Sequence, residues 1–586
     1  MKLSRRDLIK MGALGSAALV LPLERSARTA LQLANRLDPA LLPAVGQLPF
    51  SVPKVAKPTR TTLTVPGTWI DPGHPSGRDP VATEVDYYEF HMRQPKVPIL
   101  PGLPETLIWG YRGTAPGPTI HVERGRPVLV RHYNDITRQH PVLRYGPPET
   151  SVHLHGNPSL PQHDGYASDT TAPGSYKDYW YPSTEDARTL WYHDHGVHHT
   201  ASNAYMGLAG LYLLHDDLER DSGLPLRGSP DDQYGNPYDV PLVLRDAMFD
   251  TGAQLIFDDD DQSGAFGDVI LVNGVPWPNM KVEPRQYRFR ILNASVSRSF
   301  DLALSVKGST ARLPLTVVGT DGGLMEVAQA TSVLRSGMAE RYELVIDFAG
   351  LAGKTLTLRN LRPENNIEFP TTGSVMQFEV GTSVTFRGKN ATVPGKTLRP
   401  RPSCMALEET ASMPARTLTL LRENGHWTIN GKTWADVIAS GFTEALAKPK
   451  LDDVEVWTIA NPSGGWFHPV HIHLIDFRIL SRTGTKRVGV QPYERGPKDV
   501  VYVGENETVK VIARFGPQAG RYMMHCHNLV HEDHDMMHQF WVEAPAGSAV
   551  QDHDPMGSRA ADSPLDGSLT LPELPGVGPQ FPPVVP

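Results

Sequence analysis

Imidazole and thiolate side chains recur in a regular pattern along this chain. There are four His-x-His pairs, and the last encloses one of only two cysteines in 586 residues. The pairs are His153/His155, His193/His195, His471/His473 and His525/His527, with Cys526 inside the last of them. Imidazole and thiolate together suit copper, and two His, one Cys and a weak axial Met make an electron-transfer copper site. The pattern therefore predicts copper binding and redox chemistry.

The residues around Cys526 predict two different metal sites side by side. In a strand, residues two apart share one face, and the residue between them points to the other face. If residues 525–527 are extended, both imidazoles face one cluster and the thiolate faces a second site, on the order of 10 Å away. His468, His531 and Met536 lie at spacings that let them complete the thiolate site, with Met536 as the long axial ligand. Electron transfer between the two sites is the expected use.

The fold must bring distant parts of the chain together, because two His-x-His pairs lie between residues 153 and 195 and the other two between residues 471 and 527. The 53 Pro and 52 Gly indicate many short strands joined by turns, so we expect an all-β fold. The length suggests several domains. We place them at residues 59–218, 240–385 and 415–545, followed by a Pro/Asp-rich tail at residues 546–586.

The second and third of these domains share an internal repeat. Val272-Asn273-Gly274 followed by Trp277 is mirrored by Ile429-Asn430-Gly431 followed by Trp434. Where the third domain continues into its histidines, the second offers Ser297, Ser299 and Phe300. We therefore predict that the middle domain is a repeat without copper ligands.

The N-terminus carries the features of an export signal. Ser4-Arg5-Arg6-Asp7-Leu8 is a twin-arginine motif, and an apolar run follows from Met11 to Leu23. That run is shorter than the roughly 20 residues of a membrane span and fits a signal peptide. We predict a signal at residues 1–30, a periplasmic or extracellular protein, and no stable membrane anchor. The formal net charge of -8 argues against nucleic acid as a partner.

The histidine segments resemble the four copper motifs of the multicopper oxidases. The motifs are His153-Leu154-His155-Gly156, Trp191-Tyr192-His193-Asp194-His195, His468-Pro469-Val470-His471-Ile472-His473 and the run from His525 to Met537. Within that family the chain is most similar to the branch of spore-coat laccase and bilirubin oxidase, from about Thr59 to Ala544. The resemblance implies three cupredoxin-like Greek-key β-barrel domains.

The resemblance also implies four copper ions per chain and distributes the ligands among them. A type 1 copper would lie on His468, Cys526, His531 and Met536, and a type 2 copper on His153 and His471. A type 3 pair would be held by His155, His193, His195, His473, His525 and His527.

Three further residues match functional positions of the family. Asp164 and Glu532 match acids that deliver protons to reduced oxygen, which water formation requires. The alternative is that they orient a ligand histidine. Trp466 matches a tryptophan that in bilirubin oxidases is linked to the neighbouring His and lines the substrate side; the alternative is simple shielding of the metal.

The resemblance implies an oxidase that takes single electrons from phenols, aryl amines or bilirubin-like tetrapyrroles at the type 1 copper. They would pass through Cys526 to His525 and His527, and the three-copper cluster would reduce dioxygen to water. A metallo-oxidase acting on Cu(I), Fe(II) or Mn(II) and a non-enzymatic exported copper-binding envelope protein are the alternatives. The lack of a Met-rich run favours organic substrates, and the complete ligand set favours an enzyme. We expect a monomer, because a three-domain chain can close its cluster within itself.

Overall fold

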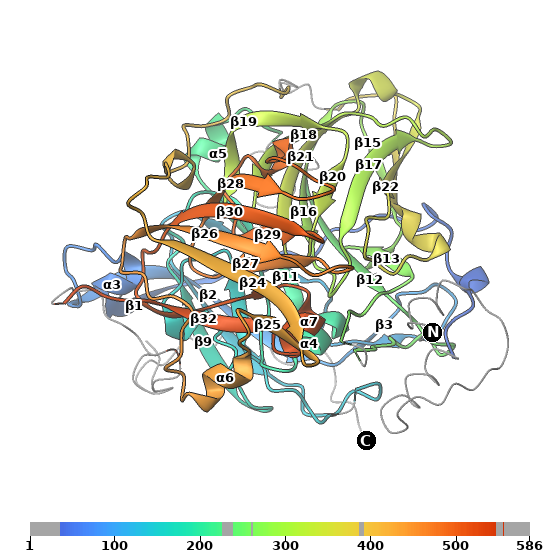
Figure 1. The fold of residues 1–586 in the computed structure, drawn as a ribbon. Helices are drawn as coiled ribbons and strands as arrows, with labels where there is room; N and C mark the ends of the chain where they lie inside the picture. The colour runs from blue at the N-terminus through green and yellow to red at the C-terminus, as the bar shows by residue number, and fades with distance from the viewer. Residues whose placement is uncertain are drawn as a thin grey trace.

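The computed structural model describes residues 35–143, 145–225, 238–259, 262–385, 392–546 and residue 555. The predicted signal peptide (residues 1–30) and almost all of the predicted tail lie outside these residues. Strands dominate the described part of the chain, so the predicted all-β class is confirmed (Figure 1). Among the described residues, no helix is long and apolar enough to cross a membrane.

Two mixed sheets form the first third of the molecule. The first sheet joins β1 (Thr59–Pro66), β2 (Pro80–Arg93), β7 (Val128–Asn134) and β9 (Tyr176–Tyr181), with β5 (Gly110–Tyr111) paired to β2. The second joins β6 (Gly117–Glu123), β11 (Ala209–His215), β10 (Arg188–Asp194) and β8 (Val152–His155). A two-stranded ribbon, β3 (Lys96–Val97) and β4 (Thr106–Leu107), lies beside them.

Two larger sheets form the middle third. One runs in the order β14 (Val275–Pro276), β13 (Val269–Val272), β12 (Asp239–Ala247), β16 (Gln286–Asn293), β21 (Arg341–Asp347), β18 (Leu315–Thr320) and β19 (Gly323–Thr331). The other runs β15 (Asn279–Val282), β23 (Ser374–Val380), β22 (Thr355–Asn360), β17 (Phe300–Val306) and β20 (Leu334–Ser336). β16 is buried along its whole length, whereas β22 alternates between buried and partly exposed residues, as expected for a strand with one face toward solvent.

The last third repeats the two-sheet arrangement. One sheet joins β25 (His426–Ile429), β24 (Ala415–Glu423), β26 (Val454–Asn461), β30 (Glu507–Arg514) and β28 (Phe477–Thr483). The other joins β29 (Val500–Val503), β27 (His468–Ile472), β31 (Gly520–Cys526) and β32 (Met537–Val542). Each of these six sheets comes from a single stretch of chain, which supports the domain division at residues 59–218, 240–385 and 415–545 that we propose. The three stretches occupy largely separate parts of the molecule, coloured blue to cyan, green to yellow and orange to red (Figure 1).

Helices are short and connect strands. Within the described residues the α-helices are α3 (Gly67–Ile70), α4 (Thr200–Met206), α5 (Asp217–Asp221), α6 (Trp434–Ala439) and α7 (Leu529–Asp533). The 3-10 turns are η1 (Pro39–Leu41), η2 (Pro161–His163), η3 (Ala349–Leu351), η4 (Pro370–Gly373), η5 (Cys404–Ala406) and η6 (Pro492–Glu494). The α4 helix of the first region packs against α7 of the third, where the carboxylate of Asp533 accepts hydrogen bonds from the backbone N–H groups of Thr200 and Ala201. This contact ties the two histidine-bearing regions together.

Candidate metal centres

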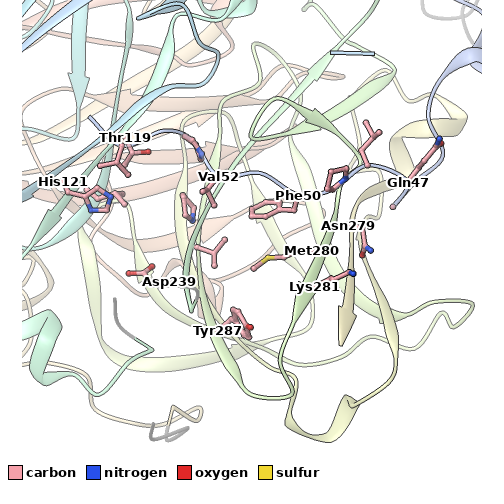
Figure 2. A pocket seen from close by; sticks show the side chains of 18 residues that line it. Gln47, Phe50, Val52, Thr119, His121, Asp239, Asn279, Met280, Lys281 and Tyr287 are labelled. Carbon is pink, nitrogen blue, oxygen red and sulfur yellow. The ribbon is translucent and has the colours of Figure 1, made fainter. Parts of the chain in front are cut away.

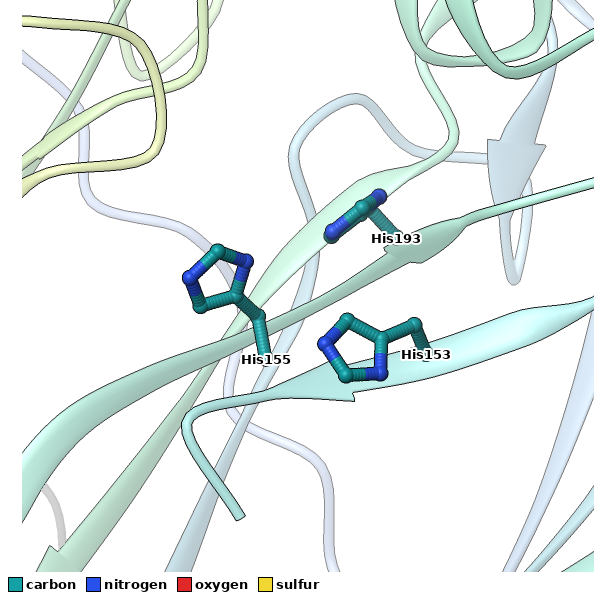
Figure 3. Close-up of side chains that lie close together, drawn as sticks. All are labelled: His153, His155 and His193. Carbon is teal, nitrogen blue, oxygen red and sulfur yellow. The ribbon is translucent and has the colours of Figure 1, made fainter. Parts of the chain in front are cut away.

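The first two His-x-His pairs come together because β8 and β10 are neighbouring antiparallel strands. His153 lies opposite His193, and His155 lies opposite Trp191. Strand alternation turns His153 and His155 to one face, while Leu154 between them packs into the hydrophobic core. The imidazoles of His153, His155 and His193 surround a common space (Figure 3).

The third region separates its ligands on the two faces of one sheet. In the pairing of β27 with β31, His471 lies opposite His525 and Val470 lies opposite Cys526. Val470 and Cys526 belong to the apolar core of this region, so the two histidines point to the other face. One sheet therefore has the thiol on its inner side and imidazoles on its outer side.

The imidazoles of the two regions meet in one buried cluster. The rings of His155 and His471 stack with centroids 3.7 Å apart, and those of His153 and His473 lie 4.0 Å apart. All eight imidazoles of the four pairs are at most 1% exposed. Packing alone rarely buries so many imidazoles against one another.

Sets of three nitrogens in this cluster are close enough to share a metal ion. One nitrogen from each of His195, His473 and His525 lies within 4.8 Å of the others, and the same holds for His153, His471 and His473. The rings of His155, His193 and His527 form a further triangle, with centroids 5.2–5.8 Å apart. The first and last of these triangles together contain the six histidines assigned to the type 3 pair.

Each of several ring positions is fixed by a hydrogen bond on one nitrogen. Nδ1 of His153, His193 and His471 donates to the backbone carbonyls of Asp164, Asp194 and Asp499, respectively, at 2.6, 2.9 and 2.9 Å. The opposite nitrogens, Nε2 of these three rings, are buried and have no hydrogen-bond partner. A ligand histidine held in this way offers its free nitrogen to a metal.

The protonation of the cluster also suits metal binding. Burial lowers the pKa of His195 to about 3, and burial together with neighbouring imidazoles holds the pKa of His473 and His527 well below the ordinary value. The rings are therefore neutral at neutral pH, which is the form that binds a metal. On the evidence of the free nitrogens and of this donor set, the cluster fits copper ions.

Cys526 and two histidines form a separate buried site. Sγ of Cys526 lies 3.3 Å from Nδ1 of His468 and 3.6 Å from Nδ1 of His531, and all three residues are at most 1% exposed. Met536 is fully buried in the same core, and its backbone carbonyl accepts a hydrogen bond from the amide of Cys526. Burial raises the pKa of the Cys526 thiol, so a bound metal must displace its proton. These residues fit the ligand set of an electron-transfer copper.

Two tryptophans cover the His531 side of the thiol site. Trp466 is half-buried, and its ring centroid lies 5.9 Å from that of His531. Trp427 of β25 is fully buried and stacks on His531 at 3.9 Å, while its Nε1 donates to the carbonyl of Gln262 in the middle region. Trp427 could not be predicted from the sequence, because no metal-binding spacing connects it with the histidines.

Asp164 and Glu532 both bridge the two histidine-bearing regions. Oδ2 of Asp164 accepts a hydrogen bond from Nδ1 of His473 at 2.8 Å. Oε2 of Glu532 lies 2.7 Å from Nδ1 of His525, and its Oε1 lies 3.6 Å from Nε2 of His195. Burial raises the pKa of Asp164; at Glu532 burial has the same effect, but His525 and His195 outweigh it and leave the pKa below its ordinary value.

A third carboxylate, which sequence analysis missed, touches the cluster. Oδ1 of Asp499 lies 3.1 Å from Nε2 of His155, and Nδ1 of that ring is buried without a partner. Asp499 stands just before β29 and outside every histidine motif, so only the pairing of β27 with β29 could have pointed to it.

Two pockets differ in their relation to these centres. The larger, of about 650 Å³, lies under the segment around Phe50 and is lined by Thr119, His121, Asp239 and Met280 among others (Figure 2). None of the predicted ligands lines it. The second, of about 390 Å³, is lined by Arg188, His471 and Asp499 among others, and so brings open space to the imidazole cluster.

The fold and the two centres together define a copper protein in which a buried thiol site and a buried cluster of imidazoles lie on opposite faces of one sheet. Family models described as multicopper oxidase match residues 94–219 and 412–546. The chain is 42% identical to bilirubin oxidase from Albifimbria verrucaria over 502 residues, which cover 84% of this chain and 80% of that protein. It is 33% identical to a laccase from Bacillus subtilis, covering 79% of this chain and 95% of that one.

Solved structures agree with this. A laccase from Pediococcus acidilactici has a TM-score of 0.68 and 26% sequence identity, with 86% of this chain and 94% of that chain covered. The chain belongs to the multicopper oxidase family. The predicted resemblance to the laccase and bilirubin oxidase branch is confirmed. The protein is a copper-dependent oxidoreductase that uses dioxygen as acceptor and a reducing substrate as donor.

Proposed function

We propose that this enzyme holds four copper ions and oxidises small organic molecules, namely phenols, aryl amines or bilirubin-like tetrapyrroles. The observation that carries the proposal is the position of Cys526: its thiol belongs to one site, and its neighbours in sequence, His525 and His527, belong to the other. Only a few covalent bonds separate the two sites. When bound, the copper ions accept the donor's electrons and reduce dioxygen to water.

The proposed ligands follow the geometry described above. His468, Cys526, His531 and Met536 hold the type 1 ion, and His153 and His471 hold the type 2 ion. His155, His193, His195, His473, His525 and His527 hold the type 3 pair. Nδ1 of His153 and of His471 is hydrogen-bonded to a backbone carbonyl, and Nδ1 of His473 to the Asp164 carboxylate, which fixes these three rings before any metal binds.

Asp164 and Glu532 supply protons in this proposal. Both are buried carboxylates in contact with a ligand histidine, and water formation consumes protons that the neutral imidazoles of the cluster do not supply. The carboxylate of Asp164 lies at Nδ1 of His473, and the carboxylate of Glu532 lies at Nδ1 of His525.

The donor is oxidised where Trp466 reaches the surface. Trp466 is the partly exposed member of the tryptophan pair, and Trp427 connects it to His531 by ring contacts of 5.0 and 3.9 Å. A flat aromatic donor can stack on such a surface. The twin-arginine motif supports export to the periplasm or beyond, and its short apolar run supports the lack of a membrane anchor. A three-domain chain can close its cluster within itself, which supports a monomer.

A substrate panel tests the proposal. Copper-loaded protein is assayed for oxygen uptake with bilirubin, a dimethoxyphenol, Fe(II), Mn(II) and Cu(I), and copper per chain is measured in the same sample. We expect four copper ions and the highest kcat/KM with an organic donor. A preference for a metal ion would make it a metallo-oxidase, and an inert protein would leave only copper binding.

Met536→Leu should raise the reduction potential of the type 1 site. The axial ligand tunes that potential, and leucine removes a sulfur donor that stabilises the oxidised ion. We expect an increase on the order of 59 mV, which corresponds to about tenfold in the equilibrium constant of a one-electron couple. A spectroelectrochemical titration measures it, and an unchanged potential would show that Met536 is not the axial ligand.

A further inference from the structure

The middle domain provides no copper ligand among its described residues, yet one of its side chains reaches the cluster. Arg341 opens β21 and is fully buried. Its Nη1 donates to Oδ1 of Asp499 at 2.7 Å, and its Nη2 donates to the other oxygen, Oδ2. The guanidinium therefore forms a bidentate ion pair with the carboxylate of Asp499, the strongest geometry for such a pair.

The remaining donors of Arg341 are occupied by three backbone carbonyls. Nε donates to Thr189 in β10, at 3.0 Å; Nη1 donates to Ala339 and Nη2 to Asp321, both in the middle domain. Through Asp499 the same side chain reaches the third domain. Arg341 thus joins all three domains at one point and has no freedom to move away from Asp499.

Asp499 in turn contacts one cluster histidine from each ligand-bearing domain. Its Oδ1, which Arg341 also holds, lies 3.1 Å from Nε2 of His155. Its backbone carbonyl accepts the hydrogen bond from Nδ1 of His471. The free nitrogens, Nδ1 of His155 and Nε2 of His471, are the ones left for metal. A shift of Asp499 would therefore displace ligands of both the type 2 and the type 3 sites.

The charges around this contact require the arginine. Asp499 is 1% exposed, and the next residue back along the chain, Lys498, is also buried. Nζ of Lys498 lies 2.9 Å from Asp321 and 3.0 Å from Glu340, so its ion pairs are with those carboxylates, while Nη1 of Arg341 lies 3.7 Å from Asp321 as well. Arg341 is the cation that pairs with the buried Asp499 carboxylate beside His155.

From these contacts we propose that Arg341 is a positioning residue for the type 2 side of the cluster. It fixes Asp499, and Asp499 fixes the rings of His155 and His471. The inference rests on the copper-ligand set proposed above. It assigns the middle domain a part in copper retention, although that domain has no ligands of its own among the described residues.

Copper retention in full-length, copper-loaded protein tests this. Arg341→Met and Arg341→Lys are compared with the unsubstituted protein by the type 2 signal in electron paramagnetic resonance and by the rate at which a chelator removes that ion. The pocket lined by His471 and Asp499 is the open space next to this site. We expect at least about tenfold faster loss in Arg341→Met, the usual effect of removing a residue that orients a ligand. The rate of type 2 copper loss in Arg341→Lys should lie between those of the unsubstituted protein and Arg341→Met. Lysine keeps the positive charge but cannot donate two parallel hydrogen bonds to the carboxylate. The type 1 absorption should not change.

Arg335→Met is the matched control. Arg335 lies in the same domain and holds Asp301 with two bonds of 2.8 Å, in a pair that belongs to the second sheet of that domain. Its loss should leave the type 2 signal and the chelation rate unchanged. Faster copper loss in this control as well would mean that any break in the middle domain loosens the cluster, and would overturn the assignment.

A double variant covers the case in which Arg341→Met fails to fold. Asp499→Asn combined with Arg341→Met removes both charges of the Arg341–Asp499 pair together. If Arg341 acts through Asp499, the double variant loses type 2 copper at the rate of Asp499→Asn alone. If the two substitutions instead multiply their effects on the rate of type 2 copper loss, the inference is refuted. A type 2 signal that is unchanged in all folded variants would refute it too. If the unsubstituted protein takes up no type 2 copper, it is the proposed ligand set that fails.

Discussion

Cys526→Ser is expected to abolish substrate oxidation and the blue absorption while leaving the fold intact. Serine has nearly the shape of cysteine, but its hydroxyl does not ionise at neutral pH and is a poor ligand for copper. Cys526 is fully buried in the core of the third domain, so the polar hydroxyl should cost about 1–3 kcal/mol of stability. That is a small loss for a protein of this size.

The measurement has three parts: visible absorption, oxygen uptake with an organic donor, and copper content per chain. We expect three copper ions per chain, because the imidazole cluster lies on the other face of the sheet and keeps all its ligands. Cys404→Ser is the control, since Cys404 is the only other cysteine and is also buried. It should keep full activity. Oxidation that survives in Cys526→Ser would rule out Cys526 as the connection between the two sites.

Local chemistry of the centres could be read from the sequence because it depends on alternation along one strand. His153 and His155 share a face for the same reason that Cys526 and His525 do not, and both statements need only the two-residue period of a strand. What places His153 opposite His193, or His471 opposite His525, is the register between strands. No local pattern encodes that register, so the resemblance to a family had to supply it.

Residues that contact the ligands without binding metal could not be predicted from the sequence, for a similar reason. Trp427 stacks on His531 from a different sheet, and Arg341 reaches Asp499 from a different domain. A single Trp or Arg has no characteristic spacing to a partner that lies more than a hundred residues away. The internal repeat predicts a middle domain without ligands. It does not reveal that Arg341 of this domain binds Asp499, the third-domain carboxylate beside His155.

Glu532→Gln is expected to lower oxygen uptake on the order of 100-fold or more while the donor still reduces the type 1 site at its normal rate. Removing a proton-transferring group typically costs this much. Glutamine keeps an oxygen that can accept the hydrogen bond from Nδ1 of His525, which the carboxylate approaches to 2.7 Å, but it cannot carry a proton. Stopped-flow reduction without oxygen is compared with steady-state oxygen uptake, and copper content is measured alongside.

The same variant decides between the two roles open to Glu532. If the carboxylate only orients His525, the amide oxygen should do so nearly as well, and any defect will come with loss of copper from the type 3 pair. If it transfers protons, copper content stays at four while oxygen uptake falls. Asp533→Asn is the control in the same helix, because Asp533 bonds to the amides of Thr200 and Ala201 rather than to a ligand. If oxygen uptake fell equally in Asp533→Asn, a disturbed helix would explain the effect of both substitutions. Proton transfer by Glu532 would then no longer be needed to explain it.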